Sequence, residues 1–119
     1  MTDFESQGKS EILILDDEID YCLLMKHYFE ERKYDVYIAN NLEEGLRLLW
    51  KIKPAIMFLD NNLPDGEGWS KIDEITGNFP NLKLYLISAY GEKPELINKT
   101  NNITFWEKPL TLAHLDDFF

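Results

Sequence analysis

The sequence predicts an α/β protein built on a parallel sheet, because short apolar segments alternate with helical patterns along most of the chain. The apolar segments are rich in β-branched and aromatic side chains, which is typical of strands buried on both faces. Five such alternations, joined by right-handed crossovers, favour a doubly wound five-stranded sheet with helices on both faces. The expected strands are residues 12–15, 34–39, 55–59, 82–87 and 103–106.

The segments between these strands carry apolar residues at spacings of three and four, the period of an amphipathic helix. A second helix should begin after Asn41, because Glu44 three positions later completes a capping-box pattern. A third helix follows Gly68, a fourth around residues 94–99 should be short, and the last covers residues 112–119. The side chains expected to face inward from the first three helices are Ile19, Cys22, Met25, Phe29, Leu42, Leu46, Leu49, Trp69, Ile72, Ile75 and Phe79.

Length and composition indicate one globular domain: the chain has 119 residues, of which 45% are hydrophobic and 29% charged. We expect residues 1–9 to form a flexible tail and residues 10–119 a single domain whose last helix is truncated. A net charge of −10 disfavours direct binding to nucleic acid or to an anionic membrane. One cysteine excludes an internal disulfide, and the polar start of the chain has no apolar segment, so we expect a cytoplasmic protein.

Polar side chains stand where the predicted strands end. Asp16 and Asp17 follow the first strand, Asp60 ends the third, Ser88 ends the fourth and Lys108 follows the fifth. In doubly wound sheets, ligands bind outside the carboxyl ends of the strands, where the strand order reverses. If the order is 2-1-3-4-5, the three aspartates converge on one pocket that Ser88 and Lys108 flank.

Three carboxylates in one pocket repel each other unless a cation lies between them. Oxygen ligands without nitrogen or sulfur favour Mg²⁺ over zinc. With a lysine opposite, the site suits the charge of a phosphoryl group in transfer. Taken singly, each residue has a simpler explanation: Asp17 or Glu18 could cap the first helix, and Ser88 could cap the fourth. Four strand ends that each supply the required residue type favour the common site.

The chain resembles the receiver domains of bacterial two-component response regulators from about Ser10 to Phe119. Four motifs carry the resemblance: Leu-Asp-Asp-Glu at 15–18, Leu-Asp-Asn-Asn-Leu-Pro-Asp-Gly-Glu-Gly at 59–68, Leu-Ile-Ser-Ala at 86–89 and Phe-Trp-Glu-Lys-Pro-Leu at 105–110. The resemblance implies a flavodoxin-like sheet of order 2-1-3-4-5. It also implies phosphotransfer from a sensor histidine kinase or a histidine phosphotransfer protein.

For the chemistry, the resemblance implies that Asp60 is the phosphoacceptor. It implies that Asp17, Asp60 and the backbone carbonyl of Asn62 ligate Mg²⁺, with Asp16 acting through metal-bound water. Lys108 resembles the lysine that pairs with the acceptor carboxylate and then with the phosphoryl oxygens. The reaction is the protein's own phosphorylation and dephosphorylation, without turnover of an external substrate, so the chain is not expected to be an enzyme in the usual sense.

For signalling, the resemblance implies that Ser88 and Phe105 occupy the two switch positions. Asn62 and Tyr90 stand two residues beyond the acceptor and the switch serine, where the family tunes autodephosphorylation. The bond between Lys108 and Pro109 resembles the family's cis peptide. An output domain or a second copy is expected to use the face made by the fourth helix, the fifth strand and the fifth helix.

Two alternatives stay open at the level of sequence. The segment from Ser88 to Lys108 is shorter than the family's usual one and lacks an alanine-rich fourth helix. This keeps open a pseudo-receiver, which would bind proteins without being phosphorylated. The other alternative is a phosphatase or phosphotransferase of the haloacid-dehalogenase type. This alternative is disfavoured because enzymes of that type have two aspartates separated by one residue after the first strand, whereas Asp16 and Asp17 of this chain are adjacent.

Overall fold

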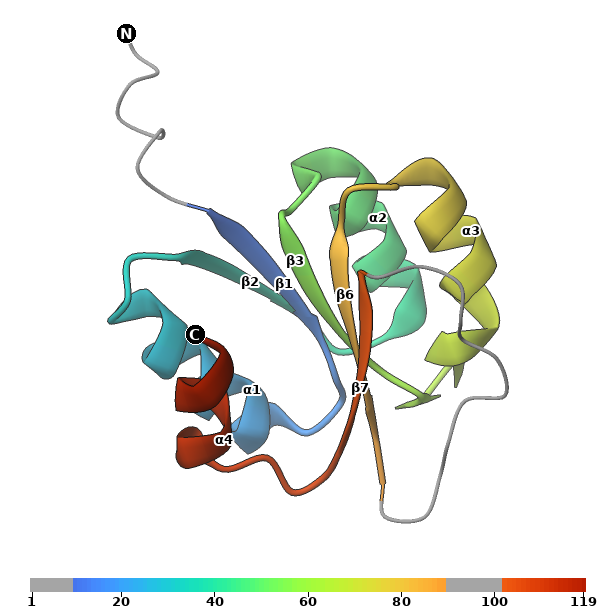
Figure 1. Cartoon of the computed structure of the whole chain (residues 1–119). Coiled ribbons are helices and arrows are strands. Elements are labelled where there is room, and N and C mark those ends of the chain that lie inside the picture. Colours follow the sequence, from blue (N-terminus) through green and yellow to red (C-terminus); the bar gives the residue numbers. More distant parts are fainter. Residues whose placement is uncertain (1–9, 90–101) are drawn as a thin grey trace, which may run out of the picture.

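The computed structural model describes residues 10–89 and 102–119. The predicted tail, the predicted fourth helix and Tyr90 lie outside these residues. A five-stranded parallel sheet, in the order β2-β1-β3-β6-β7, forms the centre of the molecule (Figure 1). Its strands are β1 (Glu11–Leu15), β2 (Asp35–Ala39), β3 (Ile56–Asp60), β6 (Lys83–Ser88) and β7 (Ile103–Glu107). The predicted flavodoxin-like order is therefore confirmed.

Helices cover both faces of this sheet (Figure 1). On one face, α1 (Ile19–Glu30) and α4 (Leu112–Phe118) pack against a core that includes Ile14, Phe58 and Trp106. On the other face lie α2 (Leu42–Ile52), the 3₁₀ turn η2 (Gly68–Lys71) and α3 (Ile72–Asn78). Because successive strand residues point to opposite faces, each strand supplies both cores, which explains its unbroken apolar character.

The predicted helix faces are largely as expected, with one exception. Cys22, Met25 and Phe29 of α1 are buried, but Ile19 is 60% exposed. Ile19 begins α1 soon after the carboxyl end of β1, and the buried face of the helix begins with Cys22. At the start of α2, the side chain of Asn41 accepts a hydrogen bond from the backbone N–H of Glu44, at 2.8 Å, as the capping pattern predicts.

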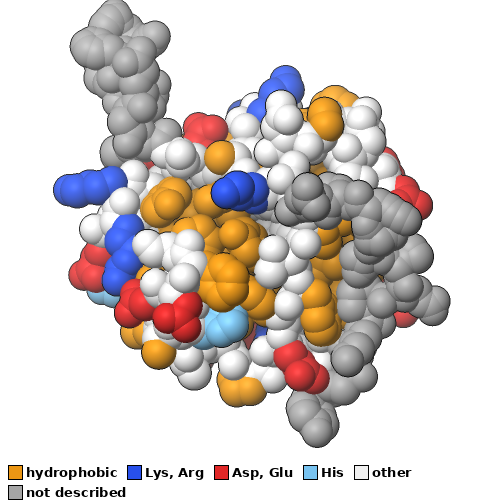
Figure 2. All heavy atoms as spheres, viewed as in Figure 1, with side chains coloured by type: hydrophobic (Ala, Val, Ile, Leu, Met, Phe, Trp, Pro, Cys, Tyr) orange, Lys and Arg blue, Asp and Glu red, His pale blue; other side chains and the backbone are white. Residues whose placement is uncertain are grey.

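An aromatic cluster fills the space between α4 and the sheet. Tyr85 and Trp106 lie with ring centroids 4.7 Å apart, and Phe119 lies 4.9 Å from Phe29 and 5.7 Å from Tyr85. Hydrophobic side chains gather on this side of the molecule (Figure 2). Offset and edge-to-face ring pairs of this kind add to the stability that burial alone provides. None of the helices described by the structure is both long and apolar enough to cross a membrane.

Candidate functional site

The carboxyl edge of the sheet brings together three aspartates. Asp16 and Asp17 follow β1, Asp60 ends the neighbouring β3, and one carboxylate oxygen from each lies within 4.8 Å of the others. Asp16 and Asp60 are buried, with 2% of each residue exposed, whereas Asp17 is exposed. The predicted convergence of these side chains is therefore present, and their oxygens can approach a single small cation.

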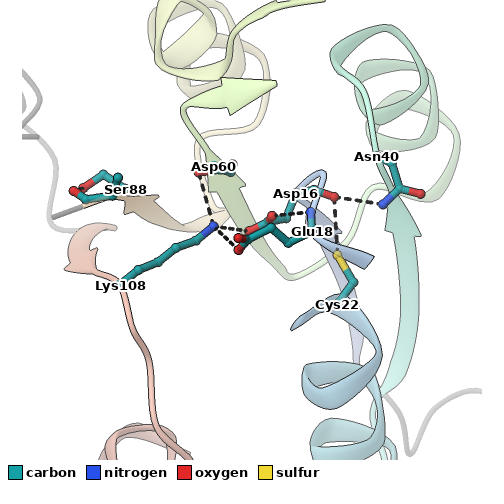
Figure 3. Close-up of polar contacts among 8 residues, drawn as sticks. Asp16, Glu18, Cys22, Asn40, Asp60, Ser88 and Lys108 are labelled. Carbon is teal, nitrogen blue, oxygen red and sulfur yellow. Dashed lines mark hydrogen bonds and ion pairs between the residues drawn. The ribbon is translucent and has the colours of Figure 1, made fainter. Parts of the chain in front are cut away.

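Asp16 is held in place through both its backbone and its side chain (Figure 3). Its carbonyl oxygen accepts hydrogen bonds from the side-chain amide of Asn40, at 2.9 Å, and from the thiol of Cys22, at 3.4 Å. Its Oδ1 accepts a hydrogen bond from the backbone N–H of Glu18 at 2.9 Å. Burial raises the pKa of the Cys22 thiol to about 12, so Cys22 acts here as a donor and not as a nucleophile.

Lys108 extends from the loop after β7 into this group of carboxylates (Figure 3). Its Nζ lies 2.9 Å from Oε1 of Glu18, 3.1 Å from Oδ2 of Asp16 and 3.8 Å from Oδ1 of Asp60. Its backbone N–H donates to the carbonyl of Ser88 at 2.8 Å, which ties the loop to the end of β6. The Lys108–Pro109 peptide bond is cis. Glu18 is therefore the nearest partner of the lysine, which the sequence did not indicate.

The electrostatics of this pocket favour a divalent cation. Burial, and then the neighbouring charge of Asp16, raises the pKa of Asp60 to about 7, and burial also raises the pKa of Asp16. One ammonium therefore does not compensate the clustered carboxylates. Hard oxygen donors with unbalanced negative charge match the ligands that Mg²⁺ prefers. Asp16, Asp17 and Asp60 fit a magnesium ion on both counts.

The two predicted switch residues lie on the side of the pocket formed by β6 and β7. Ser88 is fully buried at the end of β6, and its hydroxyl donates to the carbonyl of Ala89 at 3.0 Å. Phe105 in β7 is partly buried and meets Trp69 edge to face, with ring centroids 5.8 Å apart. Tyr90, whose position is predicted to tune autodephosphorylation, lies outside the described residues.

The loop after Asp60 is fixed by hydrogen bonds to the backbone and the side chain of Asn61. Asn61 accepts two hydrogen bonds: its carbonyl oxygen from the N–H of Gly68, at 2.9 Å, and its Oδ1 from the N–H of Trp69, at 3.0 Å. Between these points the chain forms a small hairpin of β4 (Asn62–Leu63) and β5 (Gly66–Glu67). Asn62, whose backbone carbonyl is a predicted metal ligand, begins this hairpin directly beside the acceptor.

Asp65 at the tip of the hairpin joins it to α2. Its carboxylate accepts hydrogen bonds from the first two backbone N–H groups of that helix, those of Leu42 at 2.6 Å and Glu43 at 2.9 Å. These contacts lower the pKa of Asp65, as expected for a carboxylate at a helix N-terminus. Sequence reasoning missed this role, because the two segments lie far apart in the chain and no local pattern marks the contact.

Gly68 closes the loop by lying directly against the acceptor strand. A Cβ at this position would overlap the backbone carbonyl oxygen of Asp60 and come within 2.9 Å of the Leu59 side chain. Gly66, by contrast, is required by its backbone, whose φ is +155°. The loop therefore needs each glycine for a different reason.

Gly68→Ala is expected to lower the free energy of unfolding by about 2 kcal/mol or more, since a backbone atom cannot move away as a side chain can. Gly77→Ala in α3 is the matched control: nothing lies within 4 Å of the added Cβ, and alanine favours a helix by roughly 1 kcal/mol over glycine. Urea unfolding of both variants tests the packing. If Gly68→Ala were as stable as the wild type or more stable, the close packing of Gly68 against Asp60 would be contradicted.

Comparisons with known proteins agree with this fold. Residues 12–117 match the family described as the response regulator receiver domain, and the chain belongs to this family. It is 30% identical over 110 residues to the response regulator protein PilR of Pseudomonas aeruginosa, covering 91% of this chain but 25% of PilR. It is 25% identical over 109 residues to sporulation initiation phosphotransferase F of Bacillus subtilis, covering 89% of this chain and 87% of that protein.

Solved structures show the same fold. A two-component response regulator from Clostridium difficile superposes with a TM-score of 0.74 at 27% identity, covering 92% of this chain and 91% of that one. A CheY-like receiver domain protein from Methanospirillum hungatei gives a TM-score of 0.76 at 23% identity, with 92% and 89% covered. The chain thus spans nearly the whole of these receiver structures but only a quarter of PilR.

Proposed function

We propose that this chain accepts a phosphoryl group on Asp60, with Mg²⁺ bound, from a phosphohistidine of a sensor kinase or of a histidine phosphotransfer protein in the cytoplasm. The observation that carries the proposal is the environment of Asp60. Its buried carboxylate shares one pocket with two further aspartates and lies 3.8 Å from the ammonium of Lys108. A nucleophile, carboxylates that could hold a metal ion and a cation for the phosphoryl oxygens thus meet at one edge of the sheet.

In the proposed reaction, a carboxylate oxygen of Asp60 attacks phosphorus as the bond to the donor nitrogen breaks, and the imidazole leaves with the electron pair. Asp17, Asp60 and the backbone carbonyl of Asn62 would hold the metal, with Asp16 acting through a water molecule. Bound Mg²⁺ would neutralise charge on the phosphoryl oxygens. Lys108 would bind those oxygens from the opposite side.

Signalling would follow from the new oxygens on Asp60. The hydroxyl of Ser88 is the proposed bonding partner of the phosphoryl group, and Phe105 is proposed to change rotamer with it. The two residues lie in neighbouring strands, with Leu86 of β6 opposite Phe105 in the ladder. Phosphorylation would then bias the β6 and β7 units towards a second arrangement. The proposed output surface is the face that includes β7 and α4, for a second copy or an output domain.

Dephosphorylation would depend on the residue two positions after the acceptor. Asn62 is exposed at the start of β4, where its side chain can orient an attacking water. Tyr90 is proposed to screen the phosphoryl group from that water. In this proposal the protein turns over only its own phosphoryl group, and no external substrate is consumed.

The test is to incubate the purified chain with acetyl phosphate and Mg²⁺, quench in acid and read the intact mass. We expect one phosphoryl adduct on the wild type, none with excess EDTA and none on Asp60→Asn. An adduct that persists on Asp60→Asn would place the acceptor elsewhere. No adduct on the wild type, with rapid quenching, would favour the pseudo-receiver.

A further inference from the structure

The ammonium of Lys108 lies nearer to Glu18 than to the proposed acceptor. Its hydrogen bond to Oε1 of Glu18 is 2.9 Å long, whereas its distance to Oδ1 of Asp60 is 3.8 Å, beyond hydrogen-bonding range. Glu18 stands at the N-cap position of α1, but its side chain makes no capping hydrogen bond. It reaches instead across to the loop after β7 and holds the lysine there (Figure 3).

We propose that Glu18 is a positioning residue for Lys108: it holds the ammonium on the α1 side of the pocket, so that a phosphoryl group on Asp60 competes with Glu18 for the lysine. This inference rests on the proposed function. An ammonium has three N–H donors, and in the structure Glu18 and Asp16 are within bonding distance of it. A phosphoryl group on Asp60 brings three acceptor oxygens, and one N–H of Lys108 is left for them while both carboxylates stay bonded. Further bonds to the phosphoryl group require the lysine to leave a carboxylate, and Glu18 is the more exposed of the two.

The ion pair between Glu18 and Lys108 should be weak enough for the lysine to leave it when a stronger partner is present. The side chain of Glu18 is 59% exposed, while that of Lys108 is 19% exposed. Ion pairs with an exposed partner are weak, because water competes for the charges. Beside the pair lies a groove of about 350 Å³, lined by Tyr21, Pro109 and Leu110 among others, which leaves room for the lysine chain to change rotamer.

The test uses beryllofluoride with Mg²⁺ as a non-covalent phosphoryl analogue and measures its dissociation constant by calorimetry. Glu18→Asp keeps the charge but is one methylene too short to hold the lysine, and Glu18→Gln removes the charge. Both should bind beryllofluoride about two- to five-fold more tightly than the wild type, the range for losing an exposed ion pair. Asp20→Asn, an exposed residue in the first turn of the same helix, is the control for charge alone and should bind as the wild type does.

If Glu18→Asp binds like the wild type while Glu18→Gln and Asp20→Asn tighten binding equally, general charge explains the effect and the proposal is wrong. No change in either Glu18 variant would also overturn it. A wild type that fails to bind beryllofluoride with Mg²⁺ would instead count against the proposed function.

A second measurement tests the ion pair through protein stability, first without and then with the metal and the analogue. A double-mutant cycle of Glu18→Gln and Lys108→Met, read by urea unfolding in EDTA, should show coupling between the two residues, because they are bonded in the free protein. The coupling should fall when beryllofluoride and Mg²⁺ occupy the site in all four proteins of the cycle. Coupling that is absent in EDTA, or unchanged on binding, would show that Glu18 does not hold the lysine in the free state.

Discussion

Asp60→Asn should make the metal-free protein more stable at pH 8, although it removes the proposed phosphoacceptor. The carboxylate of Asp60 is buried beside Asp16, and burial followed by that neighbouring charge raises its pKa to about 7. Above that pH the folded protein holds a charge that it stabilises poorly. Compared with an aspartate of ordinary pKa, this charge lowers the free energy of unfolding by on the order of 4 kcal/mol at most, since each pKa unit corresponds to about 1.4 kcal/mol.

The extra stability of Asp60→Asn over the wild type should increase with pH. Between the ordinary pKa of 3.8 and the folded-state value of about 7, the folded protein binds more protons at Asp60 than the unfolded chain does. Its stability therefore falls as pH rises through this range. Asparagine does not titrate, so the advantage of Asp60→Asn should be largest above pH 7, shrink below it and vanish near pH 4.

Urea unfolding in EDTA at pH 8, 6 and 4 measures this difference. Asp17→Asn is the matched control, because it removes one charge from the same cluster at an exposed position, and its effect should be smaller. Adding Mg²⁺ should narrow the gap, since a ligand that binds the folded wild type stabilises it. A less stable Asp60→Asn at pH 8, or a difference that does not vary with pH, would rule out charge burial as the dominant effect.

Much of the fold could be predicted because its strands are buried on both faces. Such strands are unbroken apolar segments, and the polar residue that ends each segment marks the carboxyl edge of the sheet. Asp60 and Ser88 end β3 and β6 as expected, and Asp16 and Lys108 follow β1 and β7 directly. Since parallel strands end at one edge, strand order alone was enough to bring the three aspartates together.

Features that depend on side-chain reach could not be predicted in this way. The helical period placed Ile19 inside, but period alone does not reveal at which residue a helix first meets the core. Glu18 looked like a capping residue, and its bond to Lys108 depends on how the loop after β7 directs the lysine. Asp65 bonds to the N-terminus of α2 across the fold, a contact that only the packing of the hairpin against that helix creates.

Lys108→Met should slow phosphorylation by acetyl phosphate about 10²- to 10³-fold. This is the usual loss in rate when one preorganised hydrogen-bond donor is removed from a reacting centre. Among the described residues, Lys108 supplies the one basic side chain within 4 Å of the Asp16 and Asp60 carboxylates. Methionine preserves much of the length and apolar stem of lysine, so the change removes mainly the charge. The rate is read as the appearance of the phosphoryl adduct by intact mass.

The same variant should bind Mg²⁺ more tightly, which separates a charge effect from general damage to the site. In the wild type the ammonium neutralises part of the carboxylate charge and repels a second cation. Removing it leaves Asp16 and Asp60 with more negative charge for the metal. Titration with Mg²⁺, followed through tryptophan fluorescence, measures the affinity.

Lys26→Met is the control for net charge, because Lys26 of α1 is partly exposed and pairs with Glu30 of the same helix at 2.8 Å. It should leave both the rate and the Mg²⁺ affinity unchanged. Losing the partner of buried Asp16 also destabilises Lys108→Met, so circular dichroism should first establish that the variant is folded at the assay temperature. A folded variant that is phosphorylated within about three-fold of the wild-type rate would show that the ammonium does not stabilise the transferring group. Weaker Mg²⁺ binding would show that Lys108 supports the metal ligands instead of competing with the metal.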